Sequence, residues 1–147
     1  MSTLRKVALV VIAAGSMVVG VWALAAPESF YEDFPGAGRV WVAVDGPYNE
    51  HLIRDVGALN LALGFVAAVP LVTGSIAVAR AAGGAALIYG VPHLVYHALH
   101  LDPFDTGDRV ALLVSLAIAA GAGLVAATPD RSAGRRLAEV PDRLGGG

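Results

Sequence analysis

Long apolar stretches alternate with short polar segments along the chain. Residues 7–26 contain no charged side chain, and a second uncharged run lies between Asp55 and Arg80. A helix that crosses a bilayer needs about 20 mainly apolar residues. Turn-forming residues at Pro70 and at positions 73–75 divide the second run into two helices. The pattern therefore predicts four membrane spans, at residues 7–26, 51–72, 75–100 and 110–127.

These spans predict an all-α fold, a four-helix transmembrane bundle formed by residues 1–128. Residues 129–147 are expected to form a flexible cytoplasmic tail. The connection between the first two helices is expected to be a long extracytoplasmic loop on the membrane surface, because its aromatic residues favour the headgroup region. Within this loop, residues 39–45 fit either a short strand or an interfacial segment. Asp108 is expected to cap the start of the fourth helix.

The composition agrees with a membrane protein. Hydrophobic residues make up 56% of the 147-residue chain, charged residues make up 15%, and the mean hydropathy is +0.68. Soluble domains carry about 25% charged residues, so this balance excludes a typical water-soluble enzyme and intrinsic disorder. A net charge of −2 gives no sign of a nucleic-acid partner. The absence of cysteine excludes disulfides and thiolate metal sites. The expected partner is the lipid bilayer.

The charged residues predict an orientation in the membrane. Basic side chains lie in the N-terminal tail, at Arg80, and in the tail after residue 128. The first and third connections are mainly acidic, and Arg39 is the only basic residue in the first. Lys and Arg concentrate on cytoplasmic flanks. We therefore expect a multi-pass protein of the plasma membrane with both termini cytoplasmic.

The first span also fits a second interpretation. Arg5 and Lys6, the apolar run and the Ala23-Leu24-Ala25 segment before Ala26 are typical of a secretory signal peptide with a small-residue cleavage site. The apolar run is longer than the roughly 7–15 residues of such peptides. A retained first helix is therefore the favoured prediction.

All four histidines are expected at one end of the bundle. His51 and Asp55 share a face of the second span, and His93, His97 and His100 share a face of the third. Helices joined by a short turn are antiparallel neighbours. The sequence therefore predicts that these five residues form one cluster near the outer membrane face.

Three roles stay open for this cluster. Ionisable groups in membrane spans usually face the bundle interior or water, so a structural polar network is the first. Imidazole and carboxylate ligands suit zinc, iron or copper, and two histidines can also hold a haem, so a metal or haem site is the second. A proton-coupled or ligand-binding pocket is the third. We expect a structural or accessory membrane protein, with a metal- or haem-binding protein for redox chemistry or metal handling as the alternative.

Small residues and one amide complete the sequence-based picture. Glycines at positions 83, 84, 121 and 123 favour close helix packing, within one bundle or in a homo-oligomer or larger membrane complex. Asn60 projects away from His51 on the helical wheel. It is therefore expected outside the histidine face, in an interhelical hydrogen bond.

Two segments carry a resemblance to a known family. Residues 46–64 (GPYNEHLIRDVGALNLALG) and residues 89–102 (YGVPHLVYHALHLD) resemble DoxX-like small four-helix membrane proteins of bacteria. The residue usage, rich in Ala, Val, Gly and Arg, is similar to that of actinobacterial proteins. The resemblance implies a four-helix integral membrane protein over most of residues 7–128. It implies no substrate and no activity.

Overall fold

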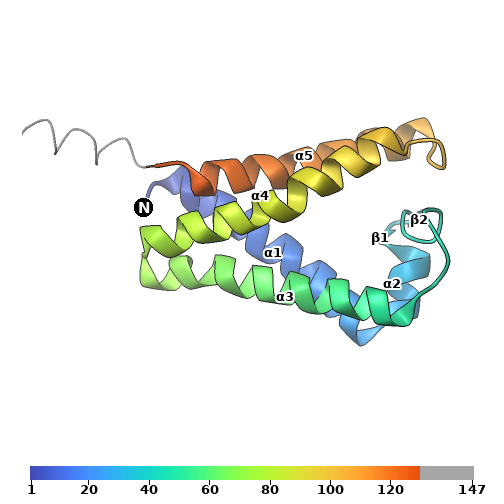
Figure 1. Ribbon diagram of the computed structural model, residues 1–147, viewed down its shortest axis with the longest axis horizontal. Helices are drawn as coiled ribbons and strands as arrows, with labels where there is room; N and C mark the ends of the chain where they lie inside the picture. The colour runs from blue at the N-terminus through green and yellow to red at the C-terminus, as the bar shows by residue number, and fades with distance from the viewer. Residues whose placement is uncertain (130–147) are drawn as a thin grey trace, which may run out of the picture.

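The computed structural model describes residues 1–129, and these form an all-helical protein with one small hairpin (Figure 1). Four of the helices are long and apolar enough to cross a membrane, as the sequence predicts. The predicted tail, residues 129–147, lies outside the described residues except for Pro129. The long helices are α1 (Thr3–Ala25), α3 (Glu50–Thr73), α4 (Ile76–Leu99) and α5 (Thr106–Ala127), and a short helix, α2 (Pro27–Asp33), follows the first of them.

The helix ends have local causes in the sequence. Asn49 and Ser75 cap α3 and α4, since each side chain accepts a hydrogen bond from a backbone N–H of the first turn. Gly74 ends α3 in the left-handed conformation (φ 71°) that glycine adopts without strain. The prediction that Asp108 caps the last span is wrong. Asp105 caps α5, and its carboxylate accepts a 2.8 Å hydrogen bond from the N–H of Asp108.

The connection between α1 and α3 is more ordered than the long loop expected from the sequence. It contains α2 and two short antiparallel strands, β1 (Pro35–Gly36) and β2 (Arg39–Val40). Only the beginning of the 39–45 segment is therefore a strand. We call residues 27–48 the cap, and the end of the bundle on which it lies the hairpin end. The opposite end, where α1 begins and α5 ends, is the terminal end (Figure 1).

The four long helices form two closely packed pairs, α1 with α3 and α4 with α5 (Figure 1). Glycines permit both contacts. A Cβ added at Gly57 of α3 would lie 3.0 Å from the backbone N of Leu24 in α1, and one added at Gly83 of α4 would lie 2.7 Å from the carbonyl oxygen of Gly123 in α5. The close approach replaces the hydrophobic driving force that is missing between helices in lipid.

The two pairs meet at the terminal end and separate toward the hairpin end (Figure 1). At the terminal end the buried core consists mostly of alanines, with Leu9 and Ile12. There the guanidinium of Arg5 donates a hydrogen bond to the backbone carbonyl of Thr128, which ties the start of α1 to the end of α5. Large apolar side chains point outward along the helices, among them Val72, Ile88 and Leu99. Such an exposed surface suits a lipid bilayer.

Candidate functional site: a cavity between the helix pairs

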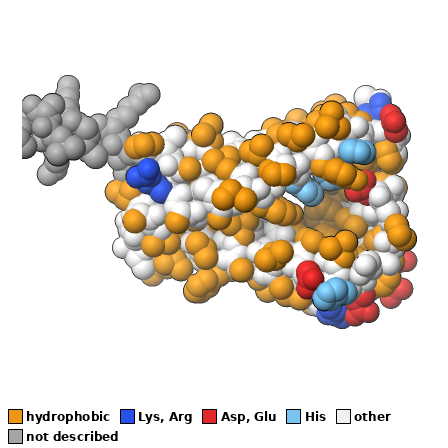
Figure 2. Space-filling view, in the orientation of Figure 1, with side chains coloured by type: hydrophobic (Ala, Val, Ile, Leu, Met, Phe, Trp, Pro, Cys, Tyr) orange, Lys and Arg blue, Asp and Glu red, His pale blue; other side chains and the backbone are white. Residues whose placement is uncertain are grey.

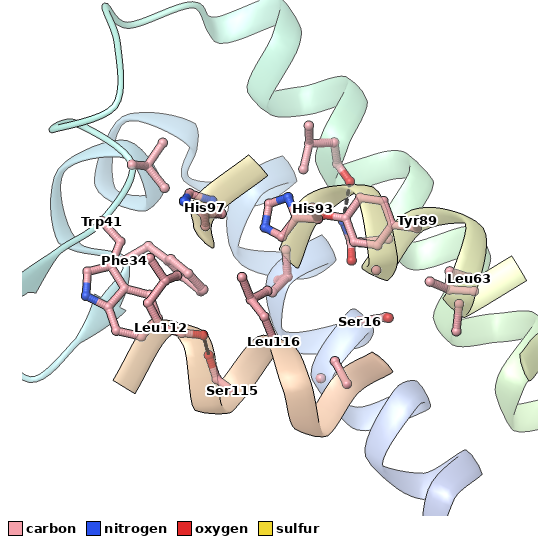
Figure 3. Close-up of a pocket in the computed structure, with 18 of the residues that line it drawn as sticks. Ser16, Phe34, Trp41, Leu63, Tyr89, His93, His97, Leu112, Ser115 and Leu116 are labelled. Atoms are coloured by element: carbon pink, nitrogen blue, oxygen red, sulfur yellow. Dashed lines mark hydrogen bonds between the residues drawn. The ribbon is translucent and has the colours of Figure 1, made fainter. Parts of the chain in front are cut away.

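A cavity of about 450 Å³ lies between the two pairs, where they separate toward the hairpin end. The space-filling view shows the molecule hollowed there (Figure 2). All four long helices and the cap supply its walls (Figure 3). Most of the lining is apolar, including Val19, Leu63, Leu112 and Leu116. A space of this size and polarity is typical of small-molecule binding sites, which measure about 300–1,000 Å³.

Each long helix contributes one polar side chain to the cavity at a similar depth. Ser16 of α1, Asn60 of α3, Tyr89 of α4 and Ser115 of α5 all line it, and each lies nine or ten residues from the end of its helix at the hairpin end. With a rise of 1.5 Å per residue, this depth is about 14 Å. The four residues therefore form a polar belt near the middle of the membrane spans.

Two members of the belt are satisfied within their own helices. The Asn60 amide donates to the carbonyl of Val56 at 2.9 Å, and the Ser115 hydroxyl donates to the carbonyl of Leu112 at 2.9 Å. The expected interhelical hydrogen bond of Asn60 is therefore replaced by one inside α3. Ser16 is buried and makes no side-chain hydrogen bond within residues 1–129. The Ser16 hydroxyl is therefore a polar group of the cavity wall without a hydrogen-bond partner among residues 1–129.

His93 and His97 line the cavity between the belt and the cap (Figure 3). Their ring centroids are 4.8 Å apart in an edge-to-face arrangement, and Tyr89 stacks on His93 at 5.4 Å. His97 is only 7% exposed. Its Nδ1 atom is buried and has no hydrogen-bond partner among the described residues. A buried nitrogen without a partner costs about 1–3 kcal/mol, so its retention here needs an explanation.

Asp45 of the cap lies at the mouth of the same cavity and is exposed to solvent. Its carboxylate accepts a 3.4 Å hydrogen bond from the hydroxyl of Tyr96. The Tyr96 ring in turn packs edge-on against His97, with 5.3 Å between the ring centroids. The cap therefore brings one carboxylate next to the two histidines of α4.

The other three residues of the predicted cluster lie elsewhere. His51 and Asp55 pair with each other at 3.3 Å, with side chains 88% and 58% exposed, and neither lines the cavity. His100 stacks on Tyr96, and its Nδ1 lies 2.8 Å from the backbone carbonyl of that tyrosine. The structure thus brings His93 and His97 together but separates them from the rest of the predicted cluster.

The orientation of α3 explains this difference. Asn60 faces the cavity, and His51 lies nine residues earlier, which at 100° per residue puts it on the opposite side of the helix. Asp55 follows one turn after His51 on that same outer side. His51 and Asp55 therefore lie on the exposed face of α3. Asn60, which the helical wheel predicts to lie outside the histidine face, lines the cavity.

The geometry gives the metal-binding alternative no support. Residues 1–129 contain no group of three or more His, Asp or Glu side chains placed to hold a metal ion. His93 and His97 are one turn apart on one helix with their rings in contact. They therefore cannot approach a haem iron from opposite faces.

The cap covers the cavity at the hairpin end by bridging the two helix pairs. On one side, Phe30 and Phe34 pack edge-on against Trp22 of α1. On the other, Trp41 packs with Phe104 and Leu112. The ring centroids of Phe34 and Trp41 are 6.1 Å apart, so a continuous series of apolar contacts runs from Trp22 of α1 to Leu112 of α5.

A carboxylate at the start of α5 fixes this arrangement. The Asp108 carboxylate accepts a 3.0 Å hydrogen bond from the indole N–H of Trp41 and forms an ion pair with Arg39. Elsewhere in the cap, partial burial and the carboxylates of Glu50 and Glu28 raise the pKa of the Tyr48 phenol above its usual value. The hairpin end therefore combines a closed aromatic layer with a surplus of negative charge.

Comparison with protein-family models, with curated proteins and with solved structures gives no match. The resemblance to DoxX-like bacterial proteins gains no support from these comparisons. The four apolar helices and the cavity between them are therefore the basis for any functional conclusion.

Proposed function

We propose that the protein binds a small, largely apolar molecule from the bilayer in the cavity between its two helix pairs. The observation that carries the proposal is the cavity itself, about 450 Å³ with apolar walls and a few inward polar groups. Ligand sites in helical bundles have this character, with polar atoms that orient the ligand and apolar walls that bury it.

The polar atoms support a ligand that forms hydrogen bonds. The Ser16 hydroxyl lines the cavity and has no recorded hydrogen bond among residues 1–129. A ligand that supplies a partner offsets the cost of burying this hydroxyl. Asp45 lies at the cavity mouth and Ser16 lies in the polar belt, so polar groups at these two depths favour an elongated molecule that extends from the cap to the belt.

The accessory role expected from the sequence, within a homo-oligomer or a larger membrane complex, stays a prediction. It is compatible with ligand binding, because a bound molecule can also stabilise an accessory subunit. The orientation with both termini cytoplasmic, which would put the cap outside the cytoplasm, also stays a prediction.

The test is a titration with prodan, a neutral fluorophore whose emission reports the polarity around it, added to the full chain in phosphatidylcholine nanodiscs. Gly15→Phe adds a ring to the cavity wall, because Gly15 lines the cavity and a Cβ there meets no atom within 4 Å. Gly121→Phe is the matched control, since a Cβ there is equally unobstructed and Gly121 does not line the cavity. Circular dichroism checks that both variants fold.

We expect saturable prodan binding that Gly15→Phe weakens by about tenfold or more, which corresponds to a loss of about 1.4 kcal/mol, and that Gly121→Phe leaves unchanged. Empty nanodiscs give the background from partitioning into lipid. The proposal is wrong if the protein adds no saturable component, or if both variants bind prodan as the unmodified protein does.

A further inference from the structure

We infer that the ligand is a lipophilic amine bound as its ammonium ion, with the charged nitrogen beside Asp45 and His97 and the apolar part among the aromatic and aliphatic walls. This inference rests on the proposed function, because it names the class of molecule that the cavity accepts. The charge of the cavity, its free hydrogen-bond acceptors and its aromatic rings each support it.

The charge of the lining favours a cation. Asp45 is the only charged residue of the described chain that lines the cavity, and no Lys or Arg joins it there. The salt bridges of residues 1–129 leave Asp45 without a basic partner, and its recorded hydrogen bond, from Tyr96, is long at 3.4 Å. A carboxylate beside an apolar cavity attracts positive charge and disfavours an anionic head group.

The surface around the cavity mouth is also negatively charged. The segment from residue 27 to residue 50 contains five acidic residues and one basic residue, Arg39, and Arg39 is already paired with Asp108. Acidic side chains gather at the hairpin end in the space-filling view (Figure 2). This potential raises the local concentration of cations near the cavity mouth.

The hydrogen-bonding groups favour an ammonium ion with N–H bonds over a fully alkylated one. An ammonium group donates up to three hydrogen bonds. The Asp45 carboxylate has two oxygens and one recorded hydrogen bond, from Tyr96, so it can accept further hydrogen bonds from N–H groups, which a fully alkylated ammonium lacks. Tyr96 holds this carboxylate beside His97, since its hydroxyl bonds Asp45 and its ring contacts His97.

Aromatic rings surround the same part of the cavity. Phe30, Phe34 and Trp41 of the cap contribute to the lining there, whereas Tyr89 lies deeper, in the polar belt. Trp41 and Phe34 lie beside His97 in the close-up (Figure 3). The faces of such rings attract cations electrostatically, and they also provide apolar contact area. A carboxylate next to several aromatic rings therefore suits a lipophilic ammonium ion better than it suits a neutral or anionic amphiphile.

The test uses competition against bound prodan by four amphiphiles with the same chain length: octylamine, octyltrimethylammonium, octan-1-ol and octanoate. At pH 7 octylamine is protonated, since alkylamines titrate near the Lys value of about 10.4. Asp45→Asn removes the charge but keeps the shape and an acceptor oxygen. Asp33→Asn is the matched control, because Asp33 also belongs to the acidic 27–50 segment but does not line the cavity.

We expect octylamine to displace prodan at about tenfold lower concentration than octan-1-ol, octyltrimethylammonium to be weaker than octylamine, and octanoate to be weakest. Asp45→Asn should reduce the preference for octylamine over octan-1-ol to about twofold or less, whereas Asp33→Asn should preserve it. Because each comparison is made in the same nanodiscs, partitioning into lipid cancels between variants.

The outcomes separate this inference from the proposed function. If prodan binds saturably but octan-1-ol or octanoate competes as well as octylamine, the cavity binds ligands and the assignment to amines is wrong. The same conclusion follows if Asp45→Asn retains the full preference for octylamine. If prodan does not bind saturably, the proposed function itself is wrong.

Discussion

Gly83 provides the most direct test of how the two halves of the bundle are built. It lies where α4 and α5 approach most closely, and an added Cβ would be 2.7 Å from the carbonyl oxygen of Gly123 and 2.8 Å from the carbonyl carbon of Ala126. Both are backbone atoms, so no side-chain rotation relieves the overlap. At Gly84, the next residue, an added Cβ meets nothing within 4 Å.

Alanine substitutions at Gly83 and Gly84 separate two effects, the gain in helix stability and the cost of overpacking. Replacing glycine by alanine inside a helix stabilises it by about 0.5–1 kcal/mol, and this gain is common to both positions. Overpacking a close contact costs about 1–3 kcal/mol, and this cost applies only to Gly83. We therefore expect Gly84→Ala to leave the free energy of unfolding unchanged or raise it slightly, and Gly83→Ala to lower it by about 1–2 kcal/mol.

The measurement is reversible unfolding in mixed micelles of dodecylmaltoside and sodium dodecyl sulfate, followed by far-ultraviolet circular dichroism. Gly121→Ala serves as a second open-position control on α5. If Gly83→Ala and Gly84→Ala have the same stability within about 0.5 kcal/mol, a difference typical of unconstrained surface positions, α4 and α5 do not pack through Gly83 and the reasoning is refuted.

Two further predictions concern the cap and the orientation of the protein. Asp108→Ala removes the acceptor of the Trp41 indole and the partner of Arg39, so amide hydrogen exchange in residues 35–45 should accelerate by about tenfold, the equivalent of about 1.4 kcal/mol. Asp102→Ala, at an exposed position, should leave exchange unchanged, and equal effects of the two variants would contradict the role given to Asp108. Fusion of a cytoplasm-active fluorescent reporter to either terminus should give signal, because the basic flanks predict that both termini lie in the cytoplasm. Activity of a periplasm-only reporter at the C-terminus would contradict this orientation.

The membrane spans could be predicted from the sequence because the thickness of a bilayer sets a minimum apolar length. The observed α3 and α4 differ by one residue at each end from the predicted spans. The predicted fourth span begins later than α5 does, since the first turn of α5, Thr106 to Arg109, is mainly polar and gives no hydropathy signal. Its helical start depends instead on the side chain of Asp105.

The cap and its contribution to the cavity could not be predicted in the same way. The aromatic residues of the cap suggested contact with lipid head groups, but Phe30 and Trp41 are buried against the helices. The local sequence does not determine which surface an aromatic ring covers, because this contact depends on how far apart the two helix pairs lie. Asp45 was therefore missed as a neighbour of the histidines, although it lines the cavity with them.

The orientation of each helix, which decides whether a polar residue faces the cavity or the lipid, follows the smallest residues. The buried positions of α3 include Ile53, Gly57, Asn60, Gly64 and Ala67, at alternating spacings of four and three residues. Asn60 belongs to this stripe and faces inward, whereas His51 and Asp55 lie off it and are exposed.

The corresponding stripe on α4 runs through Ala79, Gly83, Ala86 and Gly90. Continued by three and then four residues, it reaches His93 and His97, which line the cavity. The next step of the same spacing is His100, but α4 ends at Leu99, and His100 lies past the helix end and is exposed. The physical reason is that small side chains let helices approach each other, so they fix the buried face, and polar residues become internal only where they continue that face. In an apolar bundle, the glycines and alanines therefore identify the internal histidines more reliably than the clustering of the histidines themselves.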